Sequence, residues 1–132
     1  MALRRCACGV LMEDGRILLG KRAPHRELYP SAWDMVGGHQ EAGETLDQTL
    51  VREFEEEIDV TPMAFEKRVV IVEPRSEENG ERDYHVYAIT RWHGPGPHMC
   101  GDEHTALDWF TIGDALGLDL ALAEYRDVLR RL

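Results

Sequence analysis

The sequence has no long hydrophobic run. Its longest apolar stretches, such as 69–72, fall far short of the about 20 apolar residues that a helix needs to span a bilayer. The segment after Met1 also lacks the apolar core of a secretory signal, because the short stretch 6–12 leads directly into acidic residues. We therefore expect a cytoplasmic protein that has no membrane partner.

Cysteine is scarce as well. The chain has three cysteines, Cys6, Cys8 and Cys100, and this odd number without an export signal argues against a disulfide framework. Cys6 and Cys8 are two residues apart, so on a strand they would share one face with Val10. Zinc pairs usually have a wider spacing, and we expect both residues to be small buried core residues.

Positive charge is in short supply. The 15 Lys and Arg residues against 25 Asp and Glu residues give a net charge of −10, which opposes binding to nucleic-acid polymers or anionic membranes. Between positions 41 and 59 the only basic residue is Arg52, among the acidic residues Glu41, Glu44, Asp47, Glu53, Glu55, Glu56, Glu57 and Asp59. This segment must either face solvent or be neutralised by bound cations.

The length of the chain and its turn signals predict one α/β domain over residues 1–132. Gly and Pro positions divide the apolar segments into strands and loops. The expected elements are strands at 3–12 and 16–21 joined by a turn, a loop at 23–31, an extended piece at 33–36 stopped by Gly37 and Gly38, strands at 65–72 and 84–92 paired around an Asn79-Gly80 turn, a strand at 107–111, and a closing helix at 121–132.

The acidic segment contains a predicted helix. Thr45 and Gln48 form a capping-box pattern, and apolar residues after them recur on one helical face. Glu53, Glu56 and Glu57 are three and four positions apart, so they form an acidic ridge in which each like-charge pair costs roughly 0.2–0.5 kcal/mol. Mg²⁺ would relieve this repulsion, since it binds carboxylates together with water and substrate phosphates. The alternative is an exposed acidic helix without a ligand.

The spacing of residues around this helix matches a known signature. Gly38, then Glu44, then the run Arg52-Glu53-Phe54-Glu55-Glu56-Glu57-Ile58-Asp59-Val60 resembles the box of the Nudix hydrolases, and the wider chain resembles their MutT-like branch. Asp59 stands where the pattern has glycine. A residue just after a helix often adopts a left-handed conformation, which strains most side chains. We therefore expect Asp59 to lower local stability somewhat and to have little effect on the chemistry.

The resemblance implies a fold and a chemistry. The fold is an alpha/beta/alpha sandwich with a mixed β-sheet and a catalytic loop-helix-loop. The reaction is attack of water on a phosphorus of a nucleoside diphosphate linked to another moiety. In this resemblance Glu53, Glu56 and Glu57 would bind Mg²⁺, with Mn²⁺ as a substitute, or serve as base. Gly38 would shape the metal loop, Arg52 would orient the carboxylates, and Glu44 would support them.

Residues outside the helix complete the predicted site. Many relatives add an acid from a late loop, where we favour Glu103 over Asp102 as a catalytic residue. Arg22, Gly37, Gly38 and His39 are candidate substrate contacts. A plain structural role stays open for each of these residues.

The expected substrate is a small nucleotide, with a nucleoside triphosphate, oxidised or intact, cleaved to monophosphate and pyrophosphate as the first choice. The alternatives are an ADP-ribose or nucleotide-sugar pyrophosphatase, an isopentenyl-diphosphate isomerase and a non-catalytic nucleotide-binding module. The isomerase chemistry needs a cysteine that the segment 34–36 lacks, and the module should have lost carboxylates that are present. The MutT resemblance implies a late asparagine that reads the base, but the only asparagine of this chain is Asn79, in a predicted turn. Aspartates such as Asp119 could substitute, because a carboxyl group can accept a hydrogen bond from a purine edge. A homodimer is an open possibility.

Overall fold

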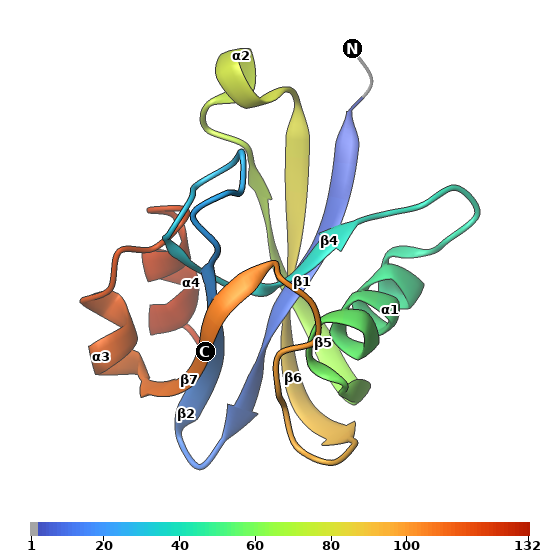
Figure 1. Ribbon diagram of the computed structural model, residues 1–132, viewed down its shortest axis with the longest axis vertical. Helices are drawn as coiled ribbons and strands as arrows, with labels where there is room; N and C mark the ends of the chain where they lie inside the picture. Colours follow the sequence, from blue (N-terminus) through green and yellow to red (C-terminus); the bar gives the residue numbers. More distant parts are fainter. Residues whose placement is uncertain (1–2) are drawn as a thin grey trace.

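The strands form one mixed sheet with helices on both sides (Figure 1). The computed structural model describes residues 3–132. Seven strands make the sheet, in the order β3-β2-β1-β6-β5, with β4 paired to β1 and β7 paired to β2. The elements are β1 (Arg4–Glu13), β2 (Arg16–Arg22), β3 (Trp33–Asp34), β4 (Val36–His39), α1 (Leu46–Ile58), β5 (Thr61–Val72), α2 (Ser76–Asn79), β6 (Arg82–His93), β7 (His104–Thr111), α3 (Ile112–Leu116) and α4 (Tyr125–Arg130).

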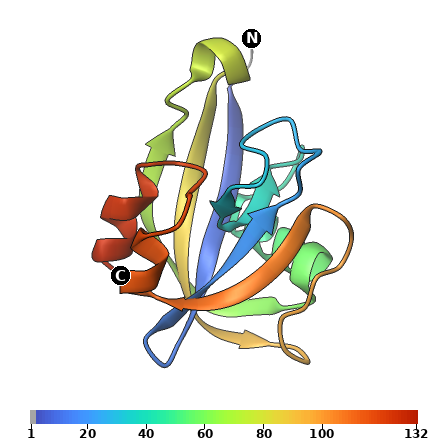
Figure 2. The same cartoon turned by 60° about the vertical axis from the view of Figure 1, so that its left-hand side comes forward.

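Strand β1 changes partners along its length. It meets β2 only beside the turn, at Met12 and Glu13, and its earlier residues pair antiparallel with β4 and parallel with β6. Strand β2 meanwhile turns away to pair with β7 (Figure 2). The divergence of β2 from β1 makes room for β4 and for the cavity described below. The parallel β1–β6 pair confirms the predicted mixed sheet.

Two apolar cores lie on opposite faces of the sheet. Leu50, Phe54 and Ile58, four residues apart on α1, are fully buried against Leu11 and Tyr87. Burial of each large apolar side chain contributes about 1.5–3 kcal/mol, so this face fixes the position of α1. The second core joins the other face of the sheet to α3 and α4, which Figures 1 and 2 show on the side opposite α1. The layers are those of the predicted sandwich.

The ends of α1 follow the prediction. The hydroxyl of Thr45 accepts a hydrogen bond from the backbone N–H of Gln48 at 3.1 Å, and the side chain of Gln48 accepts one from the N–H of Thr45 at 2.9 Å. Asp59 ends the helix in the left-handed conformation, with φ 57° and ψ 42°. Cys6 and Cys8 are buried, as expected.

Two predicted boundaries are wrong in the β3–β4 region. The extended piece expected at 33–36 is two short strands, and Gly37 and Gly38 lie inside β4 rather than ending a strand. Gly37 pairs with Cys8 of β1, and a side chain at Gly37 would collide with the backbone there. Gly37 therefore permits a close approach of two strands, where the sequence suggested a break.

The C-terminal helix and the late turn also differ from the prediction. Residues 119–121 pair with Trp33 instead of starting a helix. The N–H of Trp33 donates to the backbone carbonyl of Asp119, and the N–H of Ala121 donates to the backbone carbonyl of Trp33, each at 2.8 Å. Helix α4 begins only at Tyr125, and the unpredicted α3 precedes it. Asn79 ends the one-turn helix α2 where a tight turn was expected. Within residues 3–132, no helix combines the length and hydropathy needed to cross a bilayer.

We predict that Asp59→Gly raises the free energy of unfolding by up to about 1 kcal/mol, because glycine removes the strain of a Cβ in the left-handed region. The contact of Asp59 with His98 at 3.7 Å joins two exposed side chains and contributes little. Urea denaturation measures the change. Asp59→Ala is the matched control, since it keeps the Cβ and should gain nothing. A glycine variant less stable than the parent would show that the Asp59 side chain stabilises the helix end.

Candidate active site

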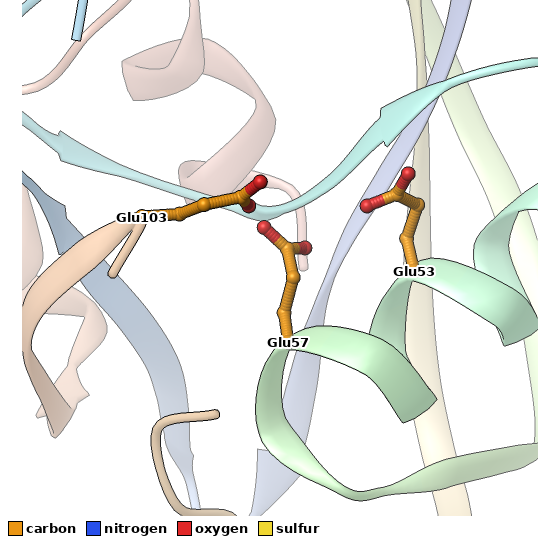
Figure 3. Close-up of side chains that lie close together, drawn as sticks. All are labelled: Glu53, Glu57 and Glu103. Carbon is orange, nitrogen blue, oxygen red and sulfur yellow. The ribbon is translucent and has the colours of Figure 1, made fainter. Parts of the chain in front are cut away.

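Three carboxylates from distant parts of the sequence converge beside β4 (Figure 3). Glu53 and Glu57 lie one helical turn apart on α1, and Glu103 lies just before β7. Each offers an oxygen, and these oxygens all lie within 4.8 Å of one another. We call these three residues the carboxylate cluster. Three negative charges at this separation repel strongly unless a proton or a cation lies among them.

Backbone hydrogen bonds hold the Glu103 loop against α1. The N–H groups of His98 and Cys100 donate to the carbonyl oxygens of Ile58 and Glu57, at 3.2 and 2.8 Å. The loop thus satisfies carbonyl groups that the end of a helix leaves without partners. The carbonyl of Glu103 then accepts from the N–H of Ala23 at 2.9 Å. This double attachment brings the glutamate to the helix.

Burial raises the free-energy cost of ionising the carboxylate cluster. Glu57 is 6% exposed, and burial together with Glu103 and Glu53 raises the pKa of the Glu57 carboxyl far above its usual range. Burial also raises the pKa of Glu53, despite its contact with Arg52. A site with these pKa shifts must bind a proton or a cation. Its all-oxygen donor set fits a hard divalent ion such as Mg²⁺ or Mn²⁺.

The glycines of β4 leave space for the carboxylates. The N–H of Gly37 donates to a carboxylate oxygen of Glu57 at 3.1 Å. A Cβ added at Gly38 would lie 2.5 Å from the carboxyl carbon of Glu53. Any side chain at Gly38 would therefore displace that carboxylate.

Arg52 and Glu44 form a bracket for the helix side chains. Arg52 donates to both oxygens of Glu44, at 2.6 and 3.0 Å, and to the carbonyl of His39 at 2.9 Å. Its remaining guanidinium nitrogen donates to Glu53 at 2.9 Å and to Glu56 at 3.2 Å. Hydrogen bonds from Arg52, then from the Glu41 backbone, lower the pKa of Glu44 to about 2. Glu44 is thus an anion that fixes Arg52, as bidentate pairs do.

Glu56 lies apart from the carboxylate cluster. Its side chain is 60% exposed, and its hydrogen bond to Arg52 connects it to Glu53. Of the two late-loop acids, the structure brings Glu103 to the helix, whereas the side chain of Asp102 is 91% exposed. The expected ridge is therefore the buried Glu57 and the half-buried Glu53, with Glu56 at the solvent edge.

A cavity of about 310 Å³ opens beside the carboxylate cluster. Arg22, His39 and both β4 glycines line it, as does Arg26, which lies 3.7 Å from Glu103. Arg22 is itself ion-paired with Asp34 at 3.0 Å. The cavity thus combines a metal-type donor set with cationic side chains.

Some lining residues carry no sequence signal. Arg26, Tyr29 and Arg82 line the cavity but belong to no recognisable motif, and only the fold brings them there. Asp119, considered above as a base reader, is exposed and does not line the cavity. Asn79 donates its amide to the buried Glu73 at 2.9 Å.

Comparison with known proteins decides the family. The NUDIX domain family model matches residues 2–132, nearly the whole chain. The chain belongs to the NUDIX family. It is a hydrolase acting on phosphoric anhydride bonds, as its family and its nucleoside triphosphatase relatives support.

Individual relatives place this NUDIX protein among MutT-like enzymes. It is similar to the nucleoside triphosphatase NudI of Salmonella newport, with 29% identity over 131 residues, 93% of this chain and 92% of NudI. The MutT NUDIX hydrolase of Burkholderia pseudomallei has a TM-score of 0.88 and 26% identity, covering 100% of this chain and 99% of that one. The NUDIX domain of Shewanella oneidensis NrtR, complexed with ADP ribose, has a TM-score of 0.80 and 20% identity, covering 99% and 88%. At that identity the likeness shows the fold alone.

We predict that Gly38→Ala weakens Mn²⁺ binding at least about tenfold, because the new methyl group displaces the Glu53 carboxylate. Isothermal titration with Mn²⁺ measures the affinity. Gly113→Ala is the matched control, since a Cβ there meets no atom within 4 Å. Equal Mn²⁺ affinity in Gly38→Ala and the parent would mean that Glu53 does not bind the ion.

Proposed function

We propose that residues 1–132 act as one Mg²⁺-dependent pyrophosphohydrolase domain that cleaves a nucleoside triphosphate to its monophosphate and pyrophosphate. The observation that carries this proposal is the convergence of Glu53, Glu57 and Glu103 on the wall of a cavity that arginines also line. The acidic groups fit a divalent ion and the arginines fit phosphates. An intact or an oxidised base is compatible with this reaction.

The relatives support a triphosphate as the substrate. NudI is named a nucleoside triphosphatase, and its match extends over almost the full length of both chains. ADP ribose is the ligand of the NrtR domain, at lower identity, and an ADP-ribose or nucleotide-sugar pyrophosphatase is the alternative function.

The proposed roles follow from the contacts. Glu53, Glu57 and Glu103 would hold Mg²⁺. Glu56, which lies outside the carboxylate cluster and is linked to Glu53 through Arg52, would add a ligand from the solvent side. When bound, the ion polarises phosphoryl oxygens and lowers the pKa of water. Arg52, fixed by Glu44, orients Glu53.

Proton transfer and charge stabilisation come from the chain itself. A carboxylate oxygen of Glu53, Glu57 or Glu103 that the ion leaves free would accept the proton of the attacking water. Arg26, beside Glu103, supplies positive charge next to the phosphates. Arg22 already donates to Asp34 and to the carbonyl of Leu28, so only its remaining N–H groups would contact the substrate.

We predict that hydrolysis requires Mg²⁺ or Mn²⁺, and that Glu56→Gln and Glu57→Gln each lower kcat at least about 100-fold, since each removes a charge from the proposed metal group. Exposed Glu56 has no role in the core, so its loss should leave the thermal midpoint unchanged. Glu55→Gln is the control on the same helix, because Glu55 contacts Thr61 away from the cavity. Activity that survives exhaustive chelation, or near-normal rates in both variants, would refute the metal assignment.

A substrate panel tests the proposed reaction. With Mg²⁺, we expect nucleoside triphosphates to give monophosphate and pyrophosphate, identified by chromatography. The panel includes 8-oxo-dGTP, ADP-ribose, nucleotide sugars and isopentenyl diphosphate. Exclusive turnover of ADP-ribose would establish the alternative function, and release of inorganic phosphate from the triphosphate would contradict the proposed bond cleavage.

A further inference from the structure

A further arginine, Arg82, reaches the cavity from β6, a strand that carries none of the carboxylate cluster. Gly37, which contacts Glu57, pairs with Cys8, and Cys8 pairs with Val86 of β6. The Cα atom of Arg82 is four residues before that of Val86 on the same strand, about 13 Å away at roughly 3.3 Å per residue. The Arg82 side chain reaches back toward the carboxylate cluster as far as His39, which pairs with Cys6. Arg82 also lines the cavity. A nucleotide whose phosphates lie at the carboxylate cluster would thus have its remaining part within reach of Arg82 in the same cavity.

Neutral groups of the protein hold the Arg82 guanidinium. Its Nε donates to the carbonyl of Asn79 at 3.0 Å, and its Nη1 lies 3.0 Å from Nε2 of His39. Because a guanidinium only donates, Nε2 of His39 must accept, so the imidazole is neutral and carries its proton on Nδ1. That Nδ1 lies 3.2 Å from the sulfur of Cys6, the acceptor it requires. Arg82 is thus positioned without losing charge to an acid.

The other arginines that line the cavity each lie beside a carboxylate. Arg22 pairs with Asp34 at 3.0 Å, and Arg26 lies 3.7 Å from Glu103. Among residues 3–132, no carboxylate lies within 4.0 Å of the Arg82 guanidinium. Its Nη2 makes no hydrogen bond to the described chain. Donors remain free at this end of the cavity.

The surroundings of Arg82 suit a planar, uncharged group more than a phosphate. Cys6 and Tyr84 line the same end, and burial raises the pKa of both side chains, so both stay neutral. Tyr29 closes this end, with its hydroxyl donating to both oxygens of the buried Glu73 at 2.7 and 2.8 Å. A base in this position would contact aromatic rings and the thiol of Cys6, and it would face the N–H groups of the Arg82 guanidinium.

We propose that Arg82 selects bases that present a carbonyl oxygen over bases that present an amino group at the equivalent position, an inference that rests on the proposed triphosphate hydrolysis. A guanidinium can donate to the carbonyl of uracil, thymine, guanine or hypoxanthine. It cannot accept from the amino group of cytosine or adenine, which would leave donors facing donors. Leaving N–H donors of Arg82 without an acceptor in a partly buried site costs more free energy than losing one contact to water. We therefore expect a large difference in kcat/KM between oxo and amino bases.

Two matched nucleotide pairs test the proposal. dUTP and dCTP differ in the 4-oxo and 4-amino groups, and dITP and dATP differ in the 6-oxo and 6-amino groups. We expect the parent protein to prefer the oxo member of each pair by roughly tenfold or more in kcat/KM. Arg82→Met should bring both ratios toward one. Arg4→Met is the matched control, because Arg4 pairs with Arg82 across the strands but does not line the cavity, so it should keep both ratios.

Other results would overturn the proposal. An equal loss of kcat/KM for both members of each pair in Arg82→Met would identify a phosphate contact instead. Unchanged ratios would show that Arg82 does not read the base. If the parent hydrolyses neither member of a pair, the proposed function fails, and calorimetric binding of dUTP and dCTP with Ca²⁺ then decides the role of Arg82 separately: equal affinities refute it, and an Arg82-dependent preference for dUTP supports it.

Discussion

Repulsion among the carboxylates of Glu53, Glu57 and Glu103 is the constraint on which the site depends. Isolated helices avoid such charges, and burial makes their ionisation costlier. The fold tolerates the carboxylate cluster because α1 is fixed independently, by its apolar face and by the capping box at Thr45. The energy of packing thus holds in place a group that electrostatics alone would disperse, and a divalent cation would relieve it.

Each neighbouring feature reduces the freedom of these carboxylates. Glu44 fixes the Arg52 side chain, and Arg52 in turn fixes the carboxylate of Glu53. Strand β4 lies so close to this carboxylate that only glycine fits at position 38. The loop before β7 bonds to the last carbonyl groups of α1 and delivers Glu103. Preorganisation of this kind lets a site stabilise charge in a reaction without rearranging first.

Local signals predicted much of the fold. The capping box, the left-handed position of Asp59 and the strand pairs were visible because they depend on residues near one another in sequence. The predicted C-terminal helix begins too early because Ala121 pairs with the distant Trp33. The break predicted at Gly37 and Gly38 is wrong because Gly37 serves contact with β1 and Gly38 makes room for Glu53. The Arg82 end of the cavity could not be predicted, since its neighbours come from four separate segments.

The most direct test of the central claim is Mn²⁺ binding by Glu103→Gln, followed by electron paramagnetic resonance. Glu103 lies outside the helix, so only its convergence with Glu53 and Glu57 gives it a place at the ion. If the carboxylate cluster holds the metal, the affinity should fall at least about tenfold, while Asp102→Asn, an exposed neighbour, should match the parent. Unchanged Mn²⁺ affinity in Glu103→Gln would contradict the account.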